Sequence, residues 1–317
     1  MNGGIGIIEM LKRTNILALV GGGRNPKFPT NQLIIWDDHQ GKIISKLRIN
    51  ENIMSVRLRN DKIIVISRNK FYLFNINTLV TITILNTFDN PLGIIALSNG
   101  DNNKLIAAFP YEAQGSIFIG DFFQKCEKLS VLHAHDSRVV CISINKEGTL
   151  MASSSDKGTL IRIYIINDDQ KFWEFRRGTK SVEMNCITFD PNNKFIGCSS
   201  NVGTIHIFSI TSIVKELDEK NKTKKDENDD EPKNSKSLLG KIGGLFNIKN
   251  AYLESERSFA KFKIQEENSL IGFGNDNTFV VITMDGKYYK VAYDPKRGGE
   301  CFKLEEKNIF KDVWFVR

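Results

Sequence analysis

The chain has 317 residues, a formal net charge of +7 and 41% hydrophobic residues, which is enough apolar content for a sizeable globular core. No stretch reaches the roughly 20 apolar residues that a transmembrane helix needs, and the charged residues within positions 1–23 exclude a typical signal peptide. The five cysteines form no Cys-x-x-Cys pair and there are only four histidines, so neither a disulfide framework nor a zinc site is expected. The basic charge is compatible with nucleic acid or an anionic membrane and decides between neither.

Strand-like segments separated by polar turns fill most of the chain. They fall into six groups of four, which cover residues 5–47, 53–84, 93–132, 139–175, 182–264 and 270–309. Short strands of even spacing, with almost no long helical pattern between them, are typical of an all-β propeller.

A repeat supports the same fold. Residues 154–159 (Ser-Ser-Asp-Lys-Gly-Thr) recur 45 positions later as residues 199–204 (Ser-Ser-Asn-Val-Gly-Thr), and residues 162–164 recur 44 positions later as residues 206–208. A period of this length is typical of a propeller blade. The dipeptide Trp36-Asp37 resembles the ending of a WD repeat. The sequence therefore predicts one β-propeller domain of four-stranded, WD40-like blades over residues 1–317.

The run Phe175-Arg176-Arg177-Gly178 ends a strand-like segment. Consecutive residues of a strand point to opposite faces, so the two arginines are expected to serve two separate pockets. Arginine offers a rigid fork of donors that suits phosphate, and Gly178 is expected to let the chain turn sharply. Paired arginines on an exposed strand are more often a solvated, salt-bridged face, so the run alone does not decide between the two interpretations.

Residues 211–257 form a long insertion between the third and fourth strands of the group that carries residues 182–264. Residues 215–236 mix Lys, Asp, Glu and Asn and are expected to be disordered. Residues 237–250 place apolar side chains on one face of a helix. These side chains are Leu238, Leu239, Ile242, Leu245 and Phe246. We expect this amphipathic segment to dip into a bilayer; the alternative is a loop that packs on its own blade.

Several stretches carry a resemblance when they are taken in order. They are residues 21–29, 34–38, 133–135, 157–162, 175–178, 203–208, 257–262 and 285–290. In order and spacing they resemble the PROPPINs, the phosphoinositide-binding WD-repeat propellers of autophagy and endosomal membranes, and in particular the shorter WIPI-type members. The resemblance covers nearly the whole chain. It implies a seven-bladed propeller that binds phosphatidylinositol 3-phosphate and phosphatidylinositol 3,5-bisphosphate through two pockets on its rim.

The resemblance also implies which residues hold the lipid headgroup. The first pocket would contain Arg176 with His135, Ser153, Ser155, Thr159 and Arg162. The second would contain Arg177 with Ser200, Thr204 and His206, and Gly178 completes the motif. A phosphate monoester carries about −1.5 to −2 charges and three acceptor oxygens, which arginine and hydroxyl donors can satisfy. Cys198 stands where the repeat has Ser153, so the second pocket lacks one hydroxyl.

Two departures from the family pattern stand out. Only six blades are readable, and we expect the family's first blade to be absent from this sequence. The turn at residues 29–31 also lacks arginines that some longer members use to hold a lipid-transfer protein of autophagy, which makes that partner less expected here.

Sequence and resemblance together predict a non-enzymatic phosphoinositide effector. It would be cytoplasmic, would be recruited peripherally to autophagosomal, endosomal or vacuolar membranes, and would recruit protein partners there. No cofactor or metal is implied. The alternative is a protein-only WD-repeat scaffold without lipid binding. The sequence has no G-x-S-x-G, HExxH or P-loop motif of an enzyme, and no recognisable motif for nucleic acid.

Overall fold

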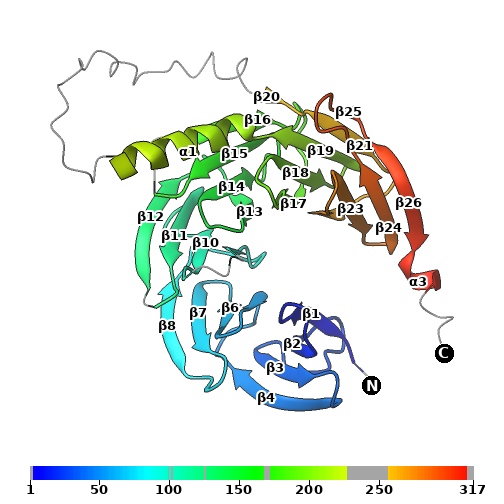
Figure 1. Cartoon of the computed structure of the whole chain (residues 1–317). Coiled ribbons are helices and arrows are strands. Elements are labelled where there is room, and N and C mark those ends of the chain that lie inside the picture. The colour runs from blue at the N-terminus through cyan, green and yellow to red at the C-terminus, as the bar shows by residue number, and fades with distance from the viewer. Residues whose placement is uncertain are drawn as a thin grey trace. The chain divides into compact units, whose positions relative to one another are not determined.

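The computed structural model describes residues 3–98, 100, 103–124, 126–167, 172–226 and 256–312. Within these residues the strands form six sheets, in which strands that follow one another along the chain lie side by side (Figure 1). The prediction of an all-β chain with six groups of four strands is therefore confirmed. The chain divides into two compact units, Met1–Ile142 and Ser143–Arg317.

Unit 1 contains three antiparallel sheets of four strands each. The first sheet consists of β1 (Ile5–Met10), β2 (Ile16–Gly21), β3 (Gln32–Asp37) and β4 (Lys42–Arg48). The second consists of β5 (Ser55–Leu58), β6 (Lys62–Ile66), β7 (Lys70–Asn75) and β8 (Thr81–Asn86). The third consists of β9 (Ala96–Leu97), β10 (Ile106–Pro110), β11 (Ser116–Asp121) and β12 (Glu127–His133).

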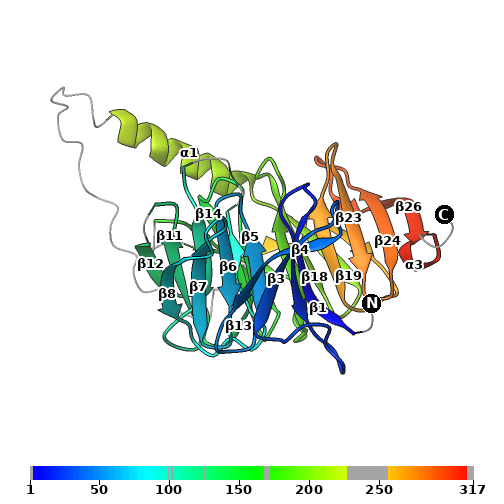
Figure 2. The same ribbon diagram turned by 90° about the horizontal axis from the view of Figure 1, so that it is seen from below.

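The core of unit 1 lies between successive sheets. Strand β6 is apolar at every position after its first residue because both of its faces are covered. Ile63 and Val65 pack with residues of the first sheet, whereas Ile64 and Ile66 pack with the aromatic side chains of the third. In Figure 2 strands β6, β7, β8, β11 and β12 of this unit lie alongside one another with similar tilts, as expected of twisted sheets that stack face to face.

Unit 2 also contains three sheets, and β13 crosses the boundary between the units. The sheet named here the β13–β16 sheet consists of β13 (Val139–Ile144), β14 (Leu150–Ser155), β15 (Leu160–Ile165) and β16 (Phe172–Arg176). The β17–β21 sheet consists of β17 (Met184–Phe189), β18 (Phe195–Ser200), β19 (Thr204–Ser209) and β21 (Ala260–Lys263). The β22–β26 sheet consists of β22 (Ser269–Phe273), β23 (Thr278–Thr283), β24 (Lys287–Ala292) and β26 (Phe302–Asn308), with the short helix α3 (Ile309–Asp312) after it.

Two additional strands were not predicted. Strand β20 (Glu256–Arg257) pairs in parallel with β16 and adds a fifth strand to the β13–β16 sheet. Strand β25 (Gly299–Glu300) pairs in parallel with β21. Each is two residues long and lies at the open edge of a sheet, so each covers backbone groups that would otherwise be an exposed edge.

The insertion after β19 begins as a helix. Helix α1 spans Thr211–Asp226, so the prediction that residues 215–236 are disordered is wrong over residues 215–226. Two physical reasons favour the helix. Lys, Glu and Leu are strong helix formers, and Ile213 is fully buried, which fixes the first turn against the protein. The remainder of that segment and all of residues 237–250 lie outside the described residues.

Candidate functional site

Two glycine turns shape the candidate site. Gly158 and Gly203 occupy equivalent positions of the repeat and have φ angles of +59° and +63°. A side chain at Gly158 would clash with the carbonyl oxygen of Val182, and one at Gly203 would clash with that of Ile264. Glycine is therefore required at both positions on conformational and steric grounds. Each turn brings the end of one polar strand beside the start of the next.

The first polar face lies on β14, β15 and β16. The register places Ser153 opposite Arg162 and Arg162 opposite Glu174, so the three side chains share one face of the sheet. Ser153 and Ser155 are buried. Arg162 donates from Nε to Glu174 Oε2 at 2.7 Å and lies 5.0 Å from the centre of the Phe172 ring.

Glu174 was not predicted as part of this face. Its carboxylate neutralises much of the Arg162 charge, so Arg162 is a weaker attractor for an anion than its sequence position implies. Arg176 lies two residues after Glu174 in the same strand and therefore on the same face. The backbone carbonyl of Thr159 accepts hydrogen bonds from the amides of Arg177, at 3.0 Å, and Gly178.

Phe175 separates the two arginines. It points toward the β17–β21 sheet and meets Phe208 edge-on, with the ring centres 5.4 Å apart. Arg177 lies two residues after Phe175 and turns toward the same sheet, where it is close enough for its charge to act on Cys198 and His206. Arg176 and Arg177 thus face opposite sides of the β13–β16 sheet.

The second polar face lies on β18, β19 and β21. Cys198, His206 and Lys261 are directly opposite one another in register, and Thr204 is opposite Lys263. Ser200 lies two residues after Cys198 and hence on the same side.

Arg177 is anchored beside the second polar face by the backbone. Its Nε donates to the carbonyl oxygen of Gly158 at 2.9 Å, and Nη2 donates to the carbonyl oxygen of Lys180. Burial lowers the pKa of the Arg177 guanidinium, although arginine side chains are effectively always protonated in proteins. A guanidinium has five N–H groups, so the two carbonyl bonds leave donors for a ligand.

His206 is held neutral within the second polar face. Burial, reinforced by the charges of Arg177 and Lys261, lowers the pKa of His206 to about 4. Its Nδ1 lies 3.3 Å from the hydroxyl oxygen of Ser258. The Ser200 hydroxyl is buried and, within the part of the chain that the structure describes, has no hydrogen-bond partner. Burial also raises the pKa of the Cys198 thiol to about 12, so this face carries positive charge and no thiolate.

The structure brings most of the predicted residues together in these two groups. Ser153, Ser155, Arg162 and Arg176 belong to the β13–β16 sheet, and Thr159 lies in the turn between β14 and β15. Arg177, Ser200, Thr204 and His206 meet at the second polar face. His135 belongs to unit 1, where its side chain is buried. The membrane-contact residues Leu238, Leu239, Ile242, Leu245 and Phe246 lie outside the described residues.

The role predicted for Gly178 needs correction. Its φ angle is not in the left-handed region, and a Cβ atom added there would meet nothing within 4 Å. No sharp turn requires glycine at this position. The open space beside its backbone would instead allow a ligand to approach closely.

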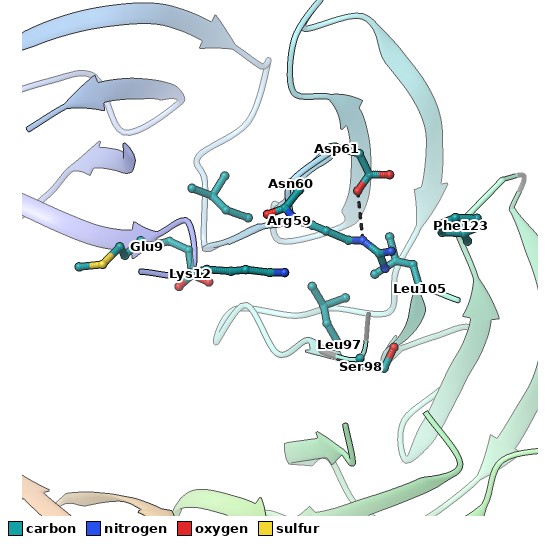
Figure 3. Close-up of a pocket in the computed structure, with 12 residues that line it drawn as sticks. Glu9, Lys12, Arg59, Asn60, Asp61, Leu97, Ser98, Leu105 and Phe123 are labelled. Atoms are coloured by element: carbon teal, nitrogen blue, oxygen red, sulfur yellow. Dashed lines mark ion pairs between the residues drawn. The ribbon is translucent and has the colours of Figure 1, made fainter. Parts of the chain in front are cut away.

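Unit 1 contains a pocket of about 670 Å³ that the sequence did not predict (Figure 3). Lys12 extends into it from the turn after β1. Arg59 lies 3.1 Å from Asp61 Oδ1 and 5.4 Å from the centre of the Phe123 ring. Burial raises the pKa of Glu9. Cations and carboxylates both line the pocket, so its charge is mixed, whereas Arg177 and Lys261 give the second polar face positive charge.

Comparison with known proteins identifies the family. The family model described as PROPPIN matches residues 5–310 of the chain. The chain belongs to the PROPPIN family. Autophagy-related protein 18e of Arabidopsis thaliana is 29% identical over 309 residues, which cover 97% of this chain and 77% of that protein. SVP1-like protein 2 of Schizosaccharomyces pombe is 36% identical over 210 residues, which cover 66% of this chain and 57% of that protein.

Solved PROPPIN structures show the same fold. Kluyveromyces lactis Hsv2 with its complete loop 6CD superposes with a TM-score of 0.72 at 21% identity, over 96% of this chain and 87% of that one. KlAtg21, in complex with the coiled-coil of AgAtg16, superposes with a TM-score of 0.73 at 23% identity, over 96% and 85% of the two chains. These matches confirm the predicted β-propeller.

Family membership settles one further point. PROPPINs are non-enzymatic propellers, so the prediction that this chain is not an enzyme is confirmed. Several of its relatives are named as autophagy-related proteins. No helix among the described residues is long and apolar enough to cross a bilayer, and the described part of this PROPPIN contains no cluster of three or more potential metal ligands.

Proposed function

We propose that this PROPPIN is a phosphoinositide effector. It binds the headgroup of phosphatidylinositol 3-phosphate or phosphatidylinositol 3,5-bisphosphate through the two polar faces beside Arg176 and Arg177. In doing so it moves from the cytoplasm to autophagosomal, endosomal or vacuolar membranes. Ser153, Ser155, Thr159 and Arg162 serve the first headgroup, and Ser200, Thr204 and His206 serve the second.

The second polar face carries the proposal. It combines a backbone-anchored guanidinium, a buried hydroxyl on Ser200 without a hydrogen-bond partner among the described residues, and a neutral imidazole. A buried polar group left unsatisfied costs about 1–3 kcal/mol. A phosphate oxygen that accepts from the hydroxyl removes this cost and at the same time meets the Arg177 charge. A protein-only scaffold has no need for such an arrangement.

Linkage of the two polar faces on one chain strengthens membrane binding. One headgroup site alone binds weakly, but two sites on one chain act together and raise avidity by about 10²–10⁴. We also assign residues 237–250 a membrane contact, since their apolar residues follow helical spacing. A chain held at the surface in this way would recruit protein partners, and its relative Atg21 forms a complex with the coiled-coil of Atg16.

Vesicle flotation tests the proposal. The chain is mixed with vesicles that contain or lack phosphatidylinositol 3-phosphate, beside the double variant Arg176→Thr/Arg177→Thr. We expect lipid-dependent flotation that the variant loses. The matched control is Lys46→Thr/Arg48→Thr, which removes two charges from exposed positions of β4 in unit 1 and should float as the unaltered chain does. Flotation that is the same for all three proteins would favour the scaffold function.

A further inference from the structure

Strand β21 places two lysines directly beside the second polar face. The register pairs His206 with Lys261 and Thr204 with Lys263. Directly opposite residues of an antiparallel pair share one face, with Cβ atoms about 4.5–5.5 Å apart. Both lysines are exposed, whereas His206 is buried. The ammonium groups therefore border the buried part of the face on its solvent side.

Positive charge dominates this border. Lys261 is close enough to His206 for its charge to help keep the imidazole neutral, and Arg177 acts on the same ring from the neighbouring sheet. One carboxylate lies nearby, because Glu300 of β25 is in register with Lys261. Among the described residues β25 pairs only with Ala260 and Lys261, so Lys263 lies beyond its end.

The strand order determines how far the lysines lie from the other polar groups of the face. Ser200 is on β18, Thr204 and His206 are on β19, and the lysines are on β21, in that order across the sheet. Neighbouring strands are about 4.8 Å apart. A phosphate bound by Arg177 and the Ser200 hydroxyl would thus lie one to two strand spacings from the lysines. One phosphate is too small to occupy the whole face. A second phosphate on the same inositol ring could lie beside the lysines.

We propose that Lys261 and Lys263 form a second phosphate subsite, so that the second polar face prefers an inositol headgroup with two monoester phosphates over a headgroup with one. This inference rests on the proposed function. It assigns Lys261 and Lys263 the role of specificity-determining residues. Lysine suits this role because its ammonium is a mobile point charge on a long side chain, which can follow a phosphate that no backbone group fixes.

Titration calorimetry with soluble headgroups tests the subsite without a membrane. Arg176→Thr is introduced first to weaken the first face. The chain is then titrated with glycerophosphoinositol 3-phosphate, which has one monoester phosphate, and with glycerophosphoinositol 3,5-bisphosphate, which has two. We expect tighter binding of the 3,5-bisphosphate. Each lysine near a phosphate contributes a factor of about five in affinity. Lys261→Gln/Lys263→Gln should therefore weaken binding of the 3,5-bisphosphate by about tenfold or more and binding of the 3-phosphate by less than about threefold.

Two further variants test whether the effect is specific to the lysines and whether it depends on Arg177. Lys290→Gln/Lys303→Gln removes two charges from the β22–β26 sheet and should change neither affinity. With Arg177→Thr in place, the Lys261 and Lys263 substitutions should have little further effect, because both act on one ligand.

The outcomes distinguish a failure of the subsite from a failure of the proposed function. Equal weakening for both headgroups would show that the lysines act by general attraction, and an unchanged preference would show that they contact no second phosphate; either overturns the subsite while the proposed function stands. If the unsubstituted chain bound neither headgroup and failed to float with lipid, the proposed function would fall and the subsite with it.

Discussion

The buried imidazole of His206 makes the stability of unit 2 depend on pH. Its pKa is lowered from 6.5 to about 4 in the folded protein. In the unfolded chain the imidazole regains its ordinary pKa, so between these two values the unfolded state binds more protons than the folded state. Stability is therefore complete above about pH 6.5 and falls as the pH decreases toward 4.

The size of the effect follows from the two pKa values. At pH 5.5 the unfolded imidazole is mostly protonated and the folded one is almost entirely neutral, which lowers the free energy of unfolding by about 1.4 kcal/mol relative to neutral pH. Below pH 4 the loss would reach about 3 kcal/mol. The side chain is only 6% exposed, so solvent screens little of this effect.

Denaturant unfolding at pH 7.5 and pH 5.5 measures the loss. His206→Gln removes the titrating group and keeps a polar partner for Ser258, so its stability should fall about 1.4 kcal/mol less than that of the unsubstituted chain. The exposed His39 provides the control, since His39→Gln should behave as the unsubstituted chain does. If the unsubstituted chain and His206→Gln lost equal stability between the two pH values, burial would not be holding the imidazole neutral and the reasoning would be refuted.

Three other changes test the geometry of the site. Gly203→Ala should destabilise the chain by about 1–2 kcal/mol from backbone strain alone, while Gly178→Ala should leave thermal unfolding unchanged because its Cβ meets open space. Glu174→Gln keeps a hydrogen-bond partner for Arg162 and removes the neutralising charge, so titration with inositol 1,3-bisphosphate should show severalfold tighter binding; weaker binding would contradict the electrostatic argument. Phe175→Ala should lower the free energy of unfolding by about 3–5 kcal/mol, because the ring is fully buried between two sheets, and a loss below 1 kcal/mol would show that this contact is not needed.

The strand groups could be predicted because each hairpin carries local information. The apolar run of β6 is visible along the chain, and so is the Gly-containing turn of the 154–159 repeat. The parallel strands β20 and β25 could not be predicted, since a two-residue strand has no periodicity to detect. Their pairing is set by the sheets they join.

The residues of the candidate site likewise divide into those that the sequence indicated and those that it did not. The hydroxyls, His206 and the two arginines lie in or beside the repeat, and the resemblance to the PROPPINs implied their roles. Glu174 was missed because its pairing with Arg162 depends on the register of β15 and β16. Lys261 and Lys263 were missed for a related reason. Their strand was expected as the fourth of its group, after the insertion 211–257, but the register that sets them opposite His206 and Thr204 is not visible in the sequence.

The two arginines are adjacent in sequence but meet different electrostatic surroundings. Arg176 shares its face with the Glu174 carboxylate, which is already bonded to Arg162. Arg177 faces a neutral imidazole, a neutral thiol and the two lysines of β21. At the two proposed sites, a phosphate with a charge of about −1.5 to −2 would therefore gain more at the second polar face, where, among the described residues, Arg177 is bonded to backbone carbonyls and to no carboxylate. The alternation of side chains in a strand, together with one glutamate, would thus make the two proposed sites unequal in strength.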